Sequence, residues 1–171
     1  MKNQTDKKRI NIKQMCLSAM FTAAVFVLTA YVHIPSYTGY IHVGDGFIYL
    51  AACLLPLPYA SFVGICGAFL ADVLTGYAMW APGSVIVKFL IVLLFSSKAK
   101  KIVCARNMTA LLPACIVTAA GYYLYEALIT FNFVAPLAAV LPNVVQSAVA
   151  GIVFVAVGIA IDRLNLKERL F

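Results

Sequence analysis

Apolar segments long enough to cross a lipid bilayer fill most of this 171-residue chain. Hydrophobic residues make up 64% of the sequence, charged residues make up only 11%, and the mean hydropathy is +0.97. A soluble domain carries about 25% charged residues, and a chain of this length cannot hide so much apolar surface from water. The composition therefore predicts an integral membrane protein, and the length predicts one compact bundle.

Six apolar segments alternate with polar or proline-containing connections. Pro56 and Pro58 favour a turn, because each lacks a backbone N–H and disfavours helix in the residue before it. This turn divides the longest apolar stretch into two helices. The first of these is short for a full span, about 15 Å, so we expect it to begin earlier or to be shielded by its neighbours. The predicted helices span residues 15–34, 46–55, 59–75, 84–97, 109–131 and 143–161.

The positions of lysine and arginine predict how the helices are oriented. Twelve of the thirteen lie in the N-terminal head, in the stretch Lys98–Arg106, or in the tail from Arg163 onward. Positively charged loops stay in the cytoplasm, and six helices place all three clusters there. We therefore predict an all-α membrane protein with six transmembrane helices and both termini inside. Residues 1–171 form a single domain, with a cytoplasmic head (1–14), a bundle (15–161) and a cytoplasmic tail (162–171). The net charge of +7 is then an orientation signal rather than a sign of nucleic-acid binding.

Polar and aromatic side chains gather in the outer third of this predicted bundle. Ionisable groups inside a membrane protein usually face a cavity or one another. Aromatic faces with a few polar groups suit a small, flat, polar ligand taken from outside the cell. The candidate substrate-binding residues are Lys88, Glu126, Asp72, Asn143, Gln146, Tyr40, Trp80, His42 and Asp45.

Lys88 is the most unusual of these candidates, because it interrupts the apolar run SVIVKFLIVLLF. A buried ammonium is costly in hydrocarbon. We hypothesise that Lys88 faces the cavity and binds the ligand or a carboxylate beside it. Two simpler alternatives are that its ammonium extends about 8 Å to the outer interface, or that it forms a closed ion pair with Glu126. As further alternatives, Asp72 and Asp45 are solvated residues at helix ends, and the aromatic residues form an interfacial belt.

Other chemistries fit the sequence less well. No G-x-S-x-G or H-E-x-x-H signature occurs, so we do not expect an enzyme. His33, His42 and Asp45 are potential metal ligands, but a loop of this composition has many other uses. We therefore predict neither a metal site nor a cofactor. The chain has no G-x-x-x-x-G-K-[ST] loop for ATP. Uptake driven by ATP would therefore need a partner that supplies the energy.

The stretch Gly39–Phe95 resembles the core of S components of energy-coupling factor (ECF) transporters. The resemblance is closest to the branch that includes hydroxymethylpyrimidine- and riboflavin-type S components. Four features carry it: a G-D pair before the second helix, an A-D pair ending the third, an aromatic-proline loop, and a lysine in the fourth helix. Gly44–Asp45, Ala71–Asp72, Trp80–Pro82 and Lys88 occupy those places.

The resemblance implies a multi-pass, non-enzymatic subunit of a prokaryotic plasma membrane. Such a subunit captures a vitamin or vitamin precursor (hydroxymethylpyrimidine, pyridoxine or a riboflavin-like compound) from outside for ATP-driven uptake. Its partners would be a transmembrane coupling protein and two ATPase subunits within the lipid bilayer. No nucleic acid is expected.

Two further roles follow from this resemblance. Ala19 and Ala23 would supply the family's A-x-x-x-A pattern for docking the coupling protein, although small residues four apart also serve ordinary helix packing. The loop 35–46 would act as a lid. The alternative function is a small ion-coupled carrier or an intramembrane enzyme that uses the same polar layer.

The predicted orientation can be tested by labelling cysteines in intact cells. We expect a cysteine at Lys100 to be protected from a membrane-impermeant reagent and one at Thr38 to be modified, because these residues lie on opposite sides in the six-helix arrangement. Labelling at position 100 from outside the cell would contradict that arrangement.

Overall fold

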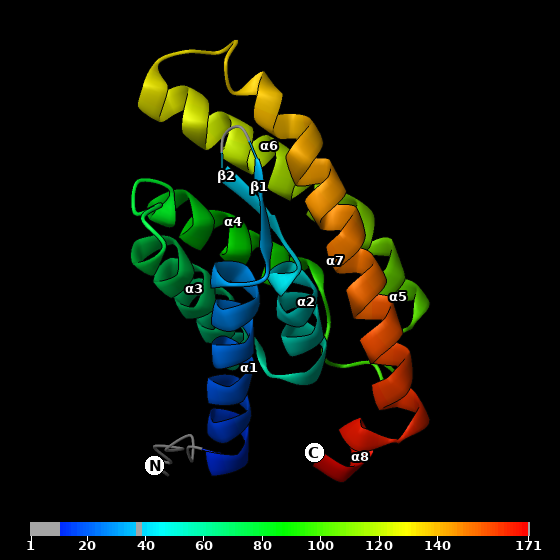
Figure 1. Ribbon diagram of the computed structural model, residues 1–171. Coiled ribbons are helices and arrows are strands. Elements are labelled where there is room, and N and C mark those ends of the chain that lie inside the picture. Colours follow the sequence, from blue (N-terminus) through cyan, green and yellow to red (C-terminus); the bar gives the residue numbers. More distant parts are fainter. Residues whose placement is uncertain (1–10, 37–38, 171) are drawn as a thin grey trace, which may run out of the picture.

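The computed structural model describes residues 11–36 and 39–170, which are predominantly helical (Figure 1). The prediction of an all-α protein needs one correction, because a short two-stranded hairpin lies between the first two helices. The elements are α1 (Ile12–Ala30), β1 (His33–Ser36), β2 (Gly39–His42), α2 (Gly44–Leu54), α3 (Leu57–Leu74), α4 (Ala81–Leu94), α5 (Ala105–Thr109), α6 (Leu111–Thr130), α7 (Leu137–Arg163) and α8 (Leu166–Leu170).

The hairpin replaces the end predicted for the first helix. α1 stops at Ala30, and His33 pairs with His42 in antiparallel register, followed by Ile34 with Ile41. Pro35 disfavours helix in the residue before it, and β-branched isoleucines favour strands. These local preferences end the helix before the predicted boundary at residue 34.

Helices α3 and α4 begin two and three residues before their predicted starts at residues 59 and 84, because each includes a proline that was assigned to a connection. Pro58 and Pro82 lie in the first turns of α3 and α4, where the missing N–H removes no helical hydrogen bond. Pro142 instead lies inside α7, which begins at Leu137, six residues before the predicted start. The side chain of Asn143 donates to the carbonyl oxygen of Ala139 at 2.9 Å, one turn back, in this part of the helix.

Helix α2 forms the centre of the molecule, which explains why so short a helix is sufficient. It packs against α1, α3, α4 and α7 (Figure 1), and ten of its eleven residues are buried. Its Tyr49 ring stacks on Phe95 at a centroid distance of 4.8 Å, and Phe154 of α7 meets both rings. The surrounding helices therefore shield α2 from lipid.

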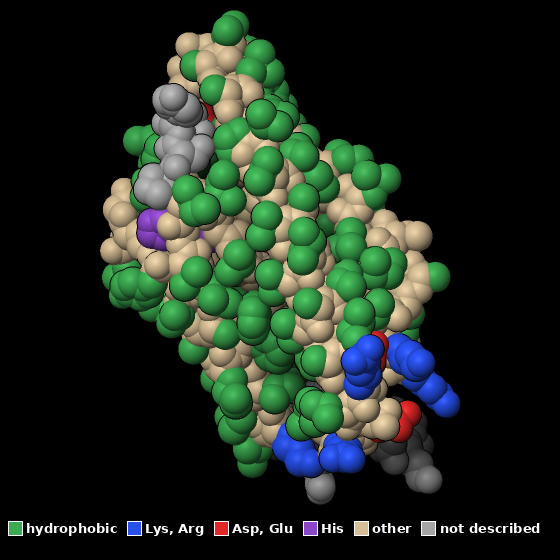
Figure 2. Space-filling model, turned by 45° about the vertical axis from the view of Figure 1, so that its right-hand side comes forward, with side chains coloured by type: hydrophobic (Ala, Val, Ile, Leu, Met, Phe, Trp, Pro, Cys, Tyr) green, Lys and Arg blue, Asp and Glu red, His purple; other side chains and the backbone are tan. Residues whose placement is uncertain are grey.

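The outer surface is that of a membrane protein with several spans. α1, α3, the α5–α6 segment and α7 are each long and apolar enough to cross a membrane, whereas α2 and α4 are shorter apolar helices. The face in Figure 2 is largely hydrophobic, and its Lys and Arg side chains gather at one end. The start of α1 and helix α8 both lie at one end of the ribbon in Figure 1.

The predicted polar tail contains helix α8, which is tied to the bundle. The ammonium of Lys167 donates to three backbone carbonyl oxygens, those of Cys53, Ser97 and Ala99, each at 2.7 Å. Partial burial lowers the pKa of Lys167. This side chain joins the end of α2 to the segment that follows α4.

Gly46 tests the packing between α2 and α7, and Gly151 on α7 is its control. A Cβ on Gly46 would lie 2.8 Å from the carbonyl oxygen of Ala150 and 3.1 Å from Val153, whereas one on Gly151 would meet nothing closer than Leu111 at 3.7 Å. We expect Gly46→Ala to cost about 1–3 kcal/mol of stability, because the helices must separate. Gly151→Ala should be neutral or stabilise by up to about 1 kcal/mol.

Thermal unfolding of the two detergent-purified variants measures this difference. A Gly46→Ala protein that melts at or above the parent temperature would contradict the close approach of the two helices.

Candidate functional site

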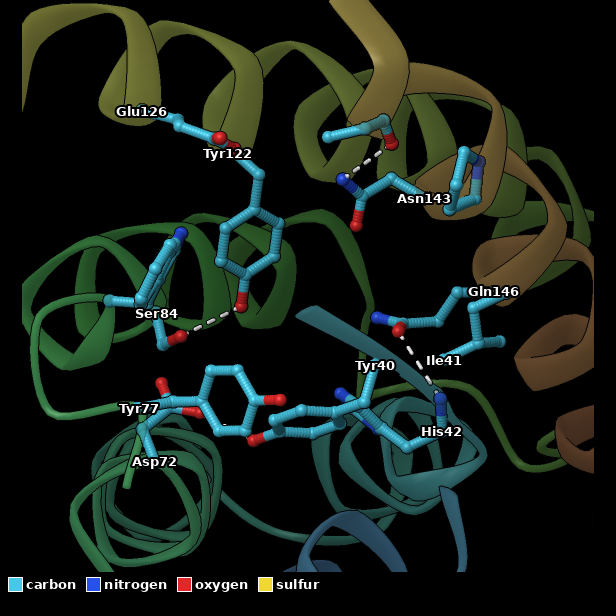
Figure 3. A pocket seen from close by; sticks show the side chains of 13 residues that line it. Tyr40, Ile41, His42, Asp72, Tyr77, Ser84, Tyr122, Glu126, Asn143 and Gln146 are labelled. Carbon is cyan, nitrogen blue, oxygen red and sulfur yellow. Dashed lines mark hydrogen bonds between the residues drawn. The ribbon is translucent and has the colours of Figure 1, made fainter. Parts of the chain in front are cut away.

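A pocket lies between the hairpin and the helices α3, α4, α6 and α7 (Figure 3). The space free of atoms is about 570 Å³, counting the part open to solvent. The lining residues are Tyr40, Ile41, His42, Asp72, Tyr77, Trp80, Ser84, Tyr122, Glu126, Ala139, Pro142, Asn143 and Gln146.

A buried ion pair lies behind this lining. The ammonium of Lys88 in α4 lies 2.7 Å from Oδ1 and 2.9 Å from Oδ2 of Asp45, which lies in the first turn of α2. The side chains are 1% and 0% exposed. The positive end of the α2 dipole adds to the stabilisation of the carboxylate. This pair fixes two central helices against each other.

This ion pair explains why a lysine interrupts the apolar helix α4. Lys88 does not extend to the interface, because it is buried, and its carboxylate partner is Asp45 rather than Glu126. Asp45 is likewise not a solvated helix end. Neither residue belongs to the pocket lining.

Gln146 connects the ion pair to the pocket and the hairpin. Its amide nitrogen donates to Oδ2 of Asp45 at 3.1 Å, and its amide oxygen accepts from the backbone N–H of His42 at 3.3 Å. The His42 ring in turn meets the hydroxyl of Thr29 in α1, with 3.4 Å between Nδ1 and Oγ1. The position of the hairpin is thus coupled to α1, α2, α4 and α7.

The imidazole of His42 is neutral at physiological pH. Burial lowers its pKa from 6.5 to about 4, the nearby Asp45 carboxylate opposes that shift, and Lys88 adds to it. A neutral ring is consistent with the adjacent fixed ion pair, because a charged imidazolium would lie buried beside Lys88. His42 therefore contributes a hydrogen-bonding ring rather than a positive charge.

Asp72 and a row of aromatic rings form one wall of the pocket. The hydroxyl of Tyr40 donates to Oδ1 of Asp72 at 2.6 Å, and burial together with the Asp72 charge raises the pKa of Tyr40. The Tyr40 and Tyr77 ring centroids are 4.8 Å apart, and those of Tyr77 and Trp80 are 5.8 Å apart. This wall offers ring faces and edges beside a carboxylate.

The opposite wall comes from α4, α6 and α7. The hydroxyls of Ser84 and Tyr122 are 2.8 Å apart, and the Lys88 ammonium lies 5.1 Å from the centroid of the Tyr122 ring. Glu126 lies one turn beyond Tyr122 on α6, and Asn143 faces the pocket from α7 (Figure 3). The site can bind a flat, polar molecule between aromatic and hydrogen-bonding groups. Within residues 11–36 and 39–170, no group of three His, Cys, Asp or Glu side chains is placed to hold a metal ion.

The structure brings seven of the nine predicted binding residues into this one pocket and places Lys88 and Asp45 behind it. The seven are Tyr40, His42, Asp72, Trp80, Glu126, Asn143 and Gln146. Sequence reasoning missed Ser84 and did not select Tyr77 or Tyr122 from the aromatic layer. Ser84 lies four residues before Lys88, on the same face of α4, and this spacing was the available signal.

Comparison with known proteins identifies one family. The model of the family described as ECF-type riboflavin transporter, S component, matches residues 9–163. No individual curated protein matches the chain. The match covers the hairpin, the ion pair and every residue that lines the pocket.

A double-mutant cycle measures the contribution of the ion pair. We expect Lys88→Met or Asp45→Asn alone to destabilise the protein by about 3–5 kcal/mol, because each leaves one buried charge without its partner. The double variant should lose much less than the sum of the two. Thermal unfolding in detergent provides the measurement. Lys100→Met, at an exposed lysine, is the control and should change stability by less than about 0.5 kcal/mol. Additive losses in the double variant would mean that the two side chains do not interact.

Proposed function

The chain belongs to the family of ECF-type riboflavin transporter S components, and we propose that the pocket described above is where it binds its substrate. As an S component, it is the membrane-embedded substrate-binding subunit of an ECF transporter for vitamin uptake, and this family is one of transport subunits rather than enzymes. The observation that carries the proposal is the convergence of seven polar or aromatic candidate residues on a single pocket.

The proposed substrate is a vitamin or vitamin precursor with a flat, polar ring, such as riboflavin, a hydroxymethylpyrimidine or pyridoxine. Tyr40 and Trp80 would contact its ring, and the other lining candidates would fix its orientation by hydrogen bonds. Lys88 and Asp45 would affect substrate binding indirectly, because Asp45 accepts a hydrogen bond from Gln146 and so holds that lining residue in place. Strand β2 would help to close the pocket as part of a lid formed by residues 35–46. Residues 37–38 of that segment lie outside the described chain.

We further propose six membrane crossings in a prokaryotic plasma membrane, with both termini in the cytoplasm and residues 1–171 forming one domain. The position of α8 and the start of α1 at one end of the molecule supports this orientation (Figure 1). The clustering of Lys and Arg at one end of the surface in Figure 2 agrees with it. The short helices α2 and α4 would then be the two crossings that rely on their neighbours.

An S component works with a transmembrane coupling protein and ATPases, and we propose that Ala19 and Ala23 form the contact with the coupling protein. Both side chains are exposed on α1, which favours a docking role over packing inside the bundle. They lie on one helical face, where small residues let another backbone approach closely.

The experiment separates substrate binding from transport. We expect Ala19→Leu with Ala23→Leu to leave the folded subunit and its ligand affinity unchanged, because neither residue lines the pocket. Uptake in cells and co-purification of the coupling protein and ATPases should be lost by steric exclusion. Mass spectrometry of the small molecules released from the purified parent and variant identifies the substrate and checks that both carry it.

Ala156 and Ala160 provide a matched control, because they are also exposed and four residues apart, on α7. Their double replacement by leucine should leave uptake intact. Full uptake by the α1 variant would exclude Ala19 and Ala23 from docking, and loss of its ligand binding would place them within the fold.

A further inference from the structure

A second hollow lies on the surface of the molecule, between the α5–α6 segment and α7. We call it the α6–α7 groove. Its space free of atoms is about 1210 Å³, counting the part open to the surroundings. Apart from Ser147, which is buried, every described residue that lines it is apolar. The groove shares no lining residue with the pocket described above.

Small residues of α7 leave the groove open. Ala148, Gly151 and Ala156 lie where larger side chains would fill the space between the two helices. Leu112 and Ile152, which also line the groove, are 70% and 69% exposed. Both the α5–α6 segment and α7 are long and apolar enough to cross a membrane. In a bilayer, an apolar hollow on their surface faces lipid chains rather than water.

The length of the groove corresponds to one layer of the bilayer. Along α7 it extends from Val144 to Ala156, which is about 18 Å at 1.5 Å per residue. The hydrocarbon core of a bilayer is about 30 Å thick, so each leaflet contributes about 15 Å. One acyl chain of a single leaflet therefore matches the groove.

A basic side chain lies beyond the Ala156 end of the groove. Arg163 is exposed in the last turn of α7, and it lies two turns after Ala156 on the same helical face. Lys and Arg side chains gather at one end of the hydrophobic face in Figure 2. Arg106 is directed elsewhere, because its guanidinium donates to the carbonyl oxygen of Leu94 at 2.7 Å.

The acidic neighbour of Arg163 faces the protein and brings a second cation close. The carboxylate of Asp162 accepts from the backbone N–H groups of Ile102 and Val103 at 2.8 and 2.9 Å. These two residues pack tightly on α7, since a Cβ on Gly158 would lie 2.9 Å from Val103. Lys101 immediately precedes them and is exposed. The end of α7 thus carries exposed positive charge, while its carboxylate is engaged by the backbone.

We propose that the α6–α7 groove binds an anionic phospholipid, with one acyl chain along the groove and the phosphate beside Arg163 and Lys101. The apolar lining and the basic end lie on the same face of α7, as the two parts of such a lipid require. A neutral lipid would use only the groove, and a soluble phosphate only the basic end. This site is separate from the proposed substrate pocket.

Native mass spectrometry of the detergent-purified, delipidated parent tests the ligand class. The probes are phosphatidylglycerol, phosphatidylcholine with the same acyl chains, and glycerol 3-phosphate. We expect phosphatidylglycerol to bind about 5- to 25-fold more tightly than phosphatidylcholine, because each basic side chain near an anionic headgroup contributes about 5-fold. Added salt should reduce this preference. Glycerol 3-phosphate should not bind measurably, because it has no chain to occupy the groove.

Arg163→Gln tests the headgroup contact. We expect it to lower the preference for phosphatidylglycerol by about 5-fold and to leave the affinity for phosphatidylcholine unchanged. Arg169→Gln is the matched control, because Arg169 is also exposed but lies on α8. It should keep the preference of the parent.

Ala148→Phe tests the chain contact by filling the groove. We expect it to weaken the binding of both lipids and to keep the ratio of their affinities. Ala120→Phe is the matched control, because Ala120 is exposed on α6 and does not line the groove. It should bind both lipids as the parent does. Thermal unfolding in detergent checks that each variant is folded.

Each alternative occupant gives a different result. If the parent binds phosphatidylcholine or glycerol 3-phosphate as tightly as phosphatidylglycerol, or if Arg163→Gln keeps the full preference, the anionic lipid is overturned as the ligand. If Ala148→Phe keeps the affinity for phosphatidylglycerol, the groove is overturned as the site. If that variant also loses co-purification of the coupling protein, the groove is instead a protein contact. The comparison among probes uses the parent alone, so it holds even if a variant fails to fold.

Discussion

The buried pair of Lys88 and Asp45 is the interaction on which the site depends. It joins α4 to the start of α2, the most buried helix of the molecule, where the two charges stabilise each other away from water. Gln146 extends this interaction to α7 and to the backbone of the hairpin. Because a charge left without its partner would be strongly unfavourable, the arrangement holds these elements in one relative position, and the pocket takes its shape from them.

The polar pocket and the apolar core lie in different parts of the molecule. The pocket is bounded by the hairpin and by parts of α3, α4, α6 and α7, whereas α2 forms a core with Phe95 and Phe154. A second set of polar contacts lies at α8, where Lys167 donates to three carbonyl oxygens and ties this helix to the bundle. The helices between these two regions expose mainly hydrophobic side chains (Figure 2), as contact with lipid requires.

Hydropathy and proline positions predicted most helices, and the polar layer predicted most of the pocket, because both are local properties of the sequence. The hairpin was missed because its strands are only four residues each, too few for a clear alternating pattern. The start of α7 was missed because a proline usually indicates a connection before a helix, whereas Pro142 lies within this one. The partner of Lys88 was open for a different reason: Asp45 lies 43 residues away, and only the packing of α2 against α4 selects it over the other carboxylates.

If the pocket is the substrate site, as proposed, stability and recognition reside in largely different side chains, because the ion pair lies behind the lining. Substitutions among the lining residues can therefore accumulate during evolution without removing the interaction that positions the helices. Gln146 is the exception, since it faces the pocket and also binds Asp45. On this proposal, a fold built this way would accept a new nutrient after changes to a few pocket residues, both in natural lineages and in the design of sensors or uptake systems for chosen small molecules.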